Sequence, residues 1–144
     1  MYDDILLPTD GSSGTAAAAD HAGTLARAFG ATVHVLSVAD TRNRFESPTS
    51  GLAPDVWLSG ERERAAEALE TAVTALPDDV RIEENRGEGN PHAEIVDYVT
   101  DADIDIVVMG THGRTGIDHY LLGSVAERVV RTAPVPVVTV PFED

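Results

Sequence analysis

The residues best suited to chemistry lie near the C-terminal end of the chain. Gly110-Thr111-His112-Gly113 is followed, after nine residues, by Gly123-Ser124. Glycine lets backbone N–H groups approach a ligand closely, and a Gly-Ser pair at a helix start adds unpaired N–H donors and the positive end of the helix dipole. This combination predicts an anion site, and the phosphates of a nucleotide suit it best.

The composition excludes several kinds of binding site. The chain has 144 residues and no cysteine, which excludes disulfides and thiolate metal sites. All ten basic residues are arginine, so a Walker-type phosphate site, which needs a lysine, is excluded too. The five histidines show no metal-ligand spacing. Phosphate charge must then be met by backbone dipoles, by Mg²⁺ held mainly by the phosphates, and by Arg114, unless Arg114 pairs with a surface carboxylate.

The charge balance is strongly acidic, with 25 acidic residues against 10 basic ones and a formal net charge of -15. Because phosphate backbones attract basic surfaces, we expect no nucleic-acid partner. The acidity either keeps the surface solvated or adapts the protein to a salty cytoplasm, as in halophilic microbes, and the lack of lysine favours the second. With no apolar run near the ~20 residues of a membrane span and an acidic N-terminus, we expect a soluble, cytoplasmic protein without membrane contact.

Strands and helices alternate along the sequence. Short apolar runs predict strands at Ile5–Pro8, Thr32–Val38, Val80–Glu84, Asp105–Met109 and Val135–Val140. Caps and helical spacing predict helices at Gly14–Phe29, Ser59–Leu76, from Asn90-Pro91 onward, and at Ser124–Arg131, with a long loop at Thr41–Leu58. The expected buried faces of the first three helices are Ala18, Ala22, Leu25 and Phe29; Ala65, Leu69, Ala72 or Val73, and Leu76; and Ile95, Val96 and Val99.

This alternation predicts one α/β domain over residues 1–144, with a parallel sheet covered by helices on both faces. Ligands of such sheets bind at the carboxyl ends of the strands, where the strand order reverses. Asp10 and Gly110 follow the first and fourth expected strands. The fold and the glycine motif therefore indicate the same place for the site.

The spacing G-x2-G-x9-G-S, together with Pro8-Thr9-Asp10-Gly11-Ser12, resembles the universal stress protein family, and the glycine spacing resembles its ATP-binding branch. The resemblance covers nearly the whole chain, including Val38-Ala39-Asp40 and Pro134-Val135-Pro136-Val137. It implies a Rossmann-like open five-stranded parallel sheet in the strand order 3-2-1-4-5. That order sets the first and fourth strands side by side.

The resemblance also implies roles for individual residues at the nucleoside. Asp10 would bind the ribose or the adenine, although it could instead cap the first helix. Pro8 and Thr9 would line the same wall. Val38 would meet adenine through its backbone groups, and Met109 would give an apolar contact to the base or sugar.

At the phosphates the resemblance implies binding by the main chain. The wrapping segment would be Gly110, Thr111, His112 and Gly113, and the side chain of His112 is expected to be a solvated loop residue. The helix start, made of Gly123, Ser124, Val125 and Ala126, would meet the outer phosphates. The family often has a hydroxyl residue at the position of Ala126, so one phosphate hydrogen bond is missing there.

These features favour a nucleotide-dependent stress-response module that binds ATP, or ADP or AMP, and forms a homodimer through its last strand. No motif places a general base, so any hydrolysis is expected to be slow. A genuine ATP hydrolase or nucleotidyl or phosphoryl transferase, a dimeric scaffold that binds no nucleotide, and a flavin-binding domain stay open as alternatives.

The acidic composition gives a first test. Because salt screens the repulsion between like charges, the unfolding temperature should rise strongly between dilute buffer and molar salt. Thermal unfolding followed by circular dichroism over that range measures the rise. A flat profile would contradict adaptation to salt.

Overall fold

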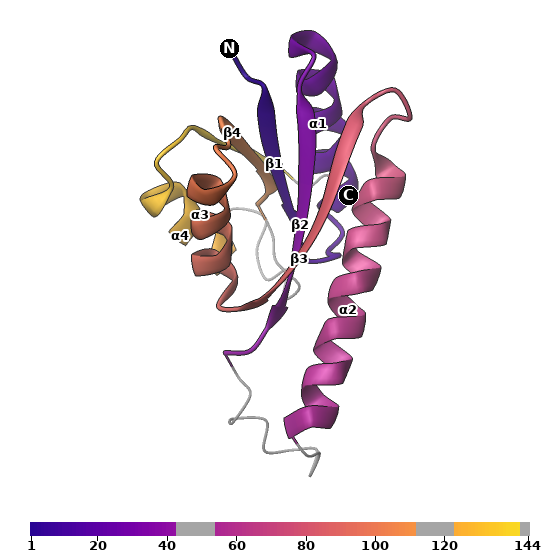
Figure 1. Ribbon diagram of the computed structural model, residues 1–144, viewed down its shortest axis with the longest axis vertical. Helices are drawn as coiled ribbons and strands as arrows, with labels where there is room; N and C mark the ends of the chain where they lie inside the picture. Colours follow the sequence, from indigo (N-terminus) through magenta and orange to yellow (C-terminus); the bar gives the residue numbers. More distant parts are fainter. Residues whose placement is uncertain (43–53, 112–122, 142–144) are drawn as a thin grey trace.

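The computed structural model describes residues 1–42, 54–111 and 123–141, with side chains from residue 56 onward in the second range. Strands and helices alternate throughout these ranges (Figure 1), as β1 Asp4–Thr9, α1 Thr15–Phe29, β2 Thr32–Asp40, α2 Pro54–Ala75, β3 Arg81–Gly89, α3 Pro91–Asp101, β4 Ile106–Gly110, α4 Ser124–Thr132 and β5 Val137–Val140.

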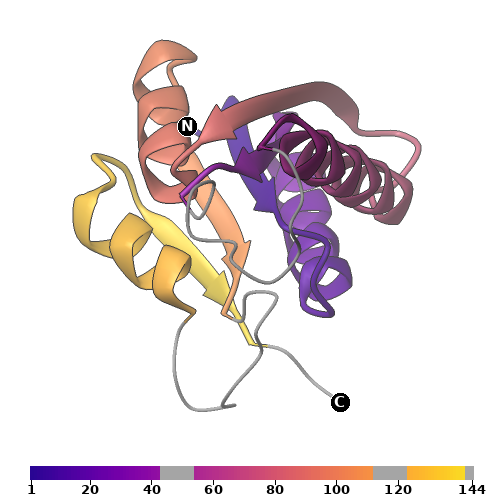
Figure 2. The ribbon, with the colours of Figure 1, turned by 90° about the horizontal axis from the view of Figure 1, so that it is seen from below.

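The five strands form one parallel sheet in the order β3-β2-β1-β4-β5. The helices α1 and α2 cover one face, and α3 and α4 cover the other (Figure 2). This arrangement confirms the expected fold class and strand order. None of the described helices is long and apolar enough to cross a membrane.

The core follows from apolar strands buried on both faces, as expected for central parallel strands. Successive side chains of a strand point to opposite faces, so Ile5 and Leu7 of β1 join the cluster under α1 and α2. Leu6, between them, joins the cluster under α3 and α4. Strand β4 divides in the same way, with Val108 on the first side and Val107 on the second.

Several element boundaries differ from those expected. Helix α2 begins at Pro54, so the end of the expected loop Thr41–Leu58 is helical, and a proline suits a first helical turn. The stretch 43–53 lies outside the described residues. Strand β3 continues to Gly89 although its sequence is polar, because it is an edge strand that pairs with β2 along its whole length. At the other edge, β5 begins only at Val137.

Some helix positions that were expected to be buried are exposed or half-buried. Phe29 is 42% exposed, and Ala26 takes the buried position at the end of α1. The ring of Phe29 instead meets that of Tyr2 edge-on, with centroids 5.0 Å apart. In α2, Ala72 is buried and Val73 is only partly buried, and in α3 the side chain of Val96 is likewise half-buried.

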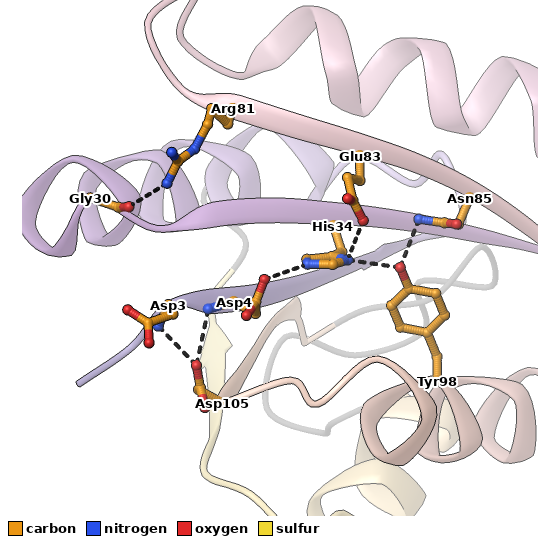
Figure 3. Close-up of polar contacts among 9 residues, drawn as sticks. All are labelled: Asp3, Asp4, Gly30, His34, Arg81, Glu83, Asn85, Tyr98 and Asp105. Carbon is orange, nitrogen blue, oxygen red and sulfur yellow. Dashed lines mark hydrogen bonds and ion pairs between the residues drawn. The ribbon is translucent and has the colours of Figure 1, made fainter.

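A buried histidine on the α3 side connects four elements (Figure 3). His34 Nε2 lies 2.8 Å from Asp4 Oδ1, and His34 Nδ1 lies 2.8 Å from the Tyr98 hydroxyl and 3.1 Å from Glu83 Oε2. Asn85 Nδ2 donates to the same hydroxyl at 2.8 Å. The network therefore joins β1, β2, β3 and α3 by polar contacts at one point of the sheet.

Tyr98 gives a pH-dependent test of this network. Burial, followed by the nearby charges of Glu83 and Asp4, raises the pKa of Tyr98 above its ordinary value. The folded protein thus holds this proton more tightly than the unfolded chain, whose tyrosines titrate at about pH 10. The contribution to the free energy of unfolding is complete below about pH 10 and is lost as the pH rises through the raised pKa. Urea titrations between pH 8 and pH 11 should show this loss in the wild type.

The matched variant is Tyr98→Phe, which removes the titrating hydroxyl and keeps the ring. The difference in unfolding free energy between wild type and variant should shrink above about pH 10. A constant difference across the whole range would show that the tyrosine proton is not coupled to folding.

Candidate functional site

A cavity of about 280 Å³ lies at the carboxyl ends of the central strands. Most of the expected site residues line it, namely Pro8, Thr9, Asp10, Val38, Met109, Gly110, Gly123, Ser124, Val125 and Ala126. Thr111 is described but is not part of the lining. His112, Gly113 and Arg114 lie outside the described residues.

The cavity forms where two neighbouring strands separate. In the fully described strands β1 and β4, the paired residues are Ile5 with Ile106 and Leu6 with Val107, while β1 stays paired with β2 as far as Thr9. Beyond Leu6 the carboxyl ends of β1 and β4 therefore diverge. This is the point where the strand order reverses, with β2 on one side of β1 and β4 on the other, and it is where ligands bind in open α/β sheets.

The two glycine segments meet at this opening. The backbone N–H of Gly123 donates to the carbonyl oxygen of Thr111, and the N–H of Thr111 donates to Val140 of β5. These bonds hold the start of α4 beside the end of β4. As a result, Gly110 and the first turn of α4 face one cavity.

The start of α4 presents unsatisfied donors. Gly123 is its N-cap residue and makes no side-chain capping bond, and the first intrahelical bond is donated by Glu127 to Gly123. The N–H groups of Ser124, Val125 and Ala126 precede that bond, so they have no partner within the helix. Such a helix start attracts an anion by its N–H groups and by its dipole.

Asp10 closes a turn and does not cap α1. Its Oδ1 accepts a hydrogen bond from the N–H of Ser12 at 2.9 Å, whereas the N-cap of α1 is Gly14. The alternative of a helix cap is therefore wrong. The turn holds the carboxylate at the cavity and uses one of its two oxygens.

Helix α2 supplies a wall of the cavity that the sequence motifs do not include. Glu61, Arg64, Ala65 and Ala68 line the cavity and follow one helical stripe. Ala68 lies so close to the loop after β1 that a Cβ on Gly11 would come within 3.2 Å of its Cβ. The stripe of two charged and two small residues is a signal in the sequence, but only the contact with that loop shows which element it faces.

The ends of β2 and of the following segment add charged groups. The carboxylate of Asp40 accepts from Arg42 Nε at 3.0 Å and from Arg42 Nη2 at 2.6 Å, and both residues line the cavity. This hydrogen-bonded carboxylate raises the pKa of Arg42. Arg64 Nε lies 3.9 Å from Glu61 Oε2, a much looser pair.

The lining thus holds the carboxylates of Asp10, Asp40 and Glu61 and two guanidinium groups. Within residues 1–42, 54–111 and 123–141, no three acidic or histidine side chains gather as a metal site would require. Other lining residues also lie outside the sequence motifs, namely Leu7, Ser12, Gly14, Thr15, Ala18, Leu36, Ser37, Pro91 and Ile95. They are ordinary core or turn residues by sequence, and only the separation of β1 from β4 exposes them to the cavity.

Known proteins share this architecture. Universal stress protein MJ0531 of Methanocaldococcus jannaschii is 40% identical over 97% of this chain and 82% of its own length. The structure of the universal stress protein UspA from Lactobacillus plantarum matches with a TM-score of 0.80 and 26% identity, over 96% of this chain and 97% of that one. The universal stress protein from Archaeoglobus fulgidus in complex with dAMP matches with a TM-score of 0.71 and 25% identity, over 96% and 98% of the two chains.

The model of the universal stress protein family matches residues 1–141. Together with the sheet order and the relatives, this match shows that the chain belongs to the universal stress protein family.

Proposed function

We propose that this protein binds an adenine nucleotide, ATP or else ADP or AMP, in the cavity at the carboxyl ends of β1 and β4. The observation that carries the proposal is the meeting of Gly110 and the α4 start on one cavity that Asp10 and Val38 also line. The Archaeoglobus fulgidus relative, which was solved with dAMP, gives independent support for a nucleotide at this fold.

In the proposed complex the phosphates lie at the N–H groups of Ser124, Val125 and Ala126. Asp10 accepts from the ribose hydroxyls, and Met109 contacts the nucleoside. Mg²⁺ would be held mainly by phosphate oxygens, since the described residues offer no acidic cage. The same proposal includes four further residues at the phosphates. The main chain would bind them at Thr111, His112 and Gly113, and the positive charge would come from Arg114.

The proposed role is that of a cytoplasmic stress-response module with slow or no hydrolysis. Hydrolysis needs a base that positions and deprotonates a water. The lining carboxylate of Asp40 is bound by Arg42, and that of Asp10 accepts from the backbone of Ser12. We therefore propose that the protein signals by whether nucleotide is bound, and not by hydrolysing the nucleotide.

The direct test is retention of the nucleotide. Protein purified in high salt with Mg²⁺ should release an adenine nucleotide on denaturation, identified by mass spectrometry. Gly110→Ala should weaken ATP binding on the order of tenfold, because the added methyl keeps a phosphate or ribose oxygen from its backbone. The variant should fold, since its Cβ would lie 3.5 Å from the nearest atom, the carbonyl oxygen of Gly14, which is ordinary contact. Calorimetric titration with ATP measures the change.

The matched control is Gly60→Ala on α2, where an added Cβ meets nothing within 4 Å and which does not line the cavity. It should bind ATP as the wild type does. The proposal is wrong if the wild type retains and binds no adenine nucleotide, and the placement of the site is wrong if a folded Gly110→Ala binds with full affinity.

We further propose that two copies join through the outer edge of β5. Among the described residues this strand pairs only with β4, and an apolar edge left unpaired favours association. The carbonyl groups of Pro136 and Val140 accept bonds from the β4 side, so by strand alternation the backbone of Thr139 faces outward.

Thr139→Pro tests this edge. Proline removes the outward N–H group and should therefore shift the protein from dimer to monomer in sedimentation experiments, while ATP affinity stays within about twofold. Thr139→Val, which keeps the N–H, should remain dimeric. A monomeric wild type, or a dimeric proline variant, would contradict an interface at β5.

A further inference from the structure

Ser37 of β2 has a hydroxyl that is buried without a partner. The residue is 1% exposed, and among the described buried side chains its Oγ is one of few polar atoms with no hydrogen bond. A buried hydroxyl left unpaired is unfavourable, so native proteins seldom keep one without use. The two other such atoms, on Asn90 and His92, belong to residues that do not line the cavity, whereas Ser37 does.

The surroundings of Ser37 form a polar recess in the cavity wall. Ser37 is the register partner of Thr9 on β1, and Thr9 Oγ1 lies 3.2 Å from Thr15 Oγ1 of α1. All three hydroxyl residues line the cavity, and the helices facing them contribute the small side chains Ala18, Ala65 and Ala68. Small side chains thus surround the hydroxyl groups at this part of the lining.

The recess is distant from the proposed phosphate position. Strand β2 is separated from β4 by β1, which places at least two strand spacings, about 10 Å, between Ser37 and the end of β4. A ligand with its phosphate at the start of α4 therefore reaches Ser37 with its nucleoside part. An inorganic phosphate at the same place is too short to do so.

We propose that Ser37 is a specificity-determining residue, whose hydroxyl hydrogen-bonds a polar atom of the bound nucleoside. This inference rests on the proposed function and extends it to a residue outside the glycine motif. In this structure the oxygen is covered, and a serine hydroxyl has three staggered χ1 positions among which it can turn toward a ligand. A hydroxyl both donates and accepts, so it can pair with the amino group or ring nitrogens of a base, or with a ribose hydroxyl.

The proposal makes affinity and stability change in opposite directions. Ser37→Ala removes the ligand contact, so AMP should bind about tenfold more weakly. The same change removes an unpaired buried hydroxyl, so the unfolding temperature measured without nucleotide should stay equal or rise. A serine with a purely structural role would lower the unfolding temperature when replaced.

Calorimetric titration of the full chain with AMP, beside thermal unfolding, tests this. Ser37→Thr keeps a hydroxyl and should bind within about threefold of the wild type. Ser13→Ala, exposed and outside the lining, is the matched control and should bind as the wild type does. AMP affinity of Ser37→Ala within twofold of the wild type, or a lowered unfolding temperature for that variant, overturns the proposal.

Two analogues distinguish the nucleoside groups. If Ser37 contacts the 6-amino group, wild type and Ser37→Ala bind purine riboside monophosphate equally. If Ser37 contacts the 2′-hydroxyl, wild type and Ser37→Ala bind 2′-deoxy-AMP equally. A difference in affinity that persists with both analogues assigns the contact to the remaining polar atoms of the nucleoside. A wild type that binds neither AMP nor ATP would refute the proposed function itself, which is a different result from binding that ignores Ser37.

Discussion

The separation of β1 from β4 is the constraint on which the site depends. These strands pair near their amino ends, at Ile5 with Ile106 and Leu6 with Val107, and diverge afterward. Parallel strands that part at a reversal of strand order leave backbone groups that neither strand can satisfy. Pro8, two residues beyond the last residue of β1 that pairs with β4, lacks an N–H group and so loses nothing by facing the opening. The cavity is thus a consequence of the sheet topology.

The same constraint supplies the proposed anion site with donors although the chain has few cations. Once β4 ends beside the opening, the bond from Gly123 to Thr111 brings the first turn of α4 to the same edge. Helix-start N–H groups then supply the positive potential that a lysine supplies elsewhere. Because these donors are backbone atoms, their position is set by the fold and not by the rotamer of a long side chain, which lowers the entropy lost on binding.

The sequence predicted a parallel α/β sheet because its central strands are apolar and its strands and helices alternate, whereas the strand order followed from the family resemblance. The expectations from the sequence that were wrong failed for physical reasons. Strand β3 is polar beyond Glu84, since an edge strand needs only backbone pairing with β2 to form. Phe29 follows the apolar spacing of α1 but is 42% exposed and meets the ring of Tyr2 edge-on. The glycine motif and the family resemblance together named ten of the residues that line the cavity, whereas Ser37 and the α2 stripe became visible only when strands and helices were placed against one another.

The net charge of -15 repels the proposed anionic ligand, whereas the N–H groups of α4 would attract it. Distance decides which of these two effects is stronger. Repulsion from surface carboxylates acts over the Debye length, about 10 Å at 0.1 M salt and about 3 Å at 1 M. The N–H groups of α4 would act at hydrogen-bond distance, where salt screens little. Two of the lining carboxylates also accept hydrogen bonds, Asp40 from Arg42 and Asp10 from the backbone of Ser12. In concentrated salt the distant repulsion is therefore removed while the local attraction remains, so a site built from backbone donors is compatible with an acidic surface.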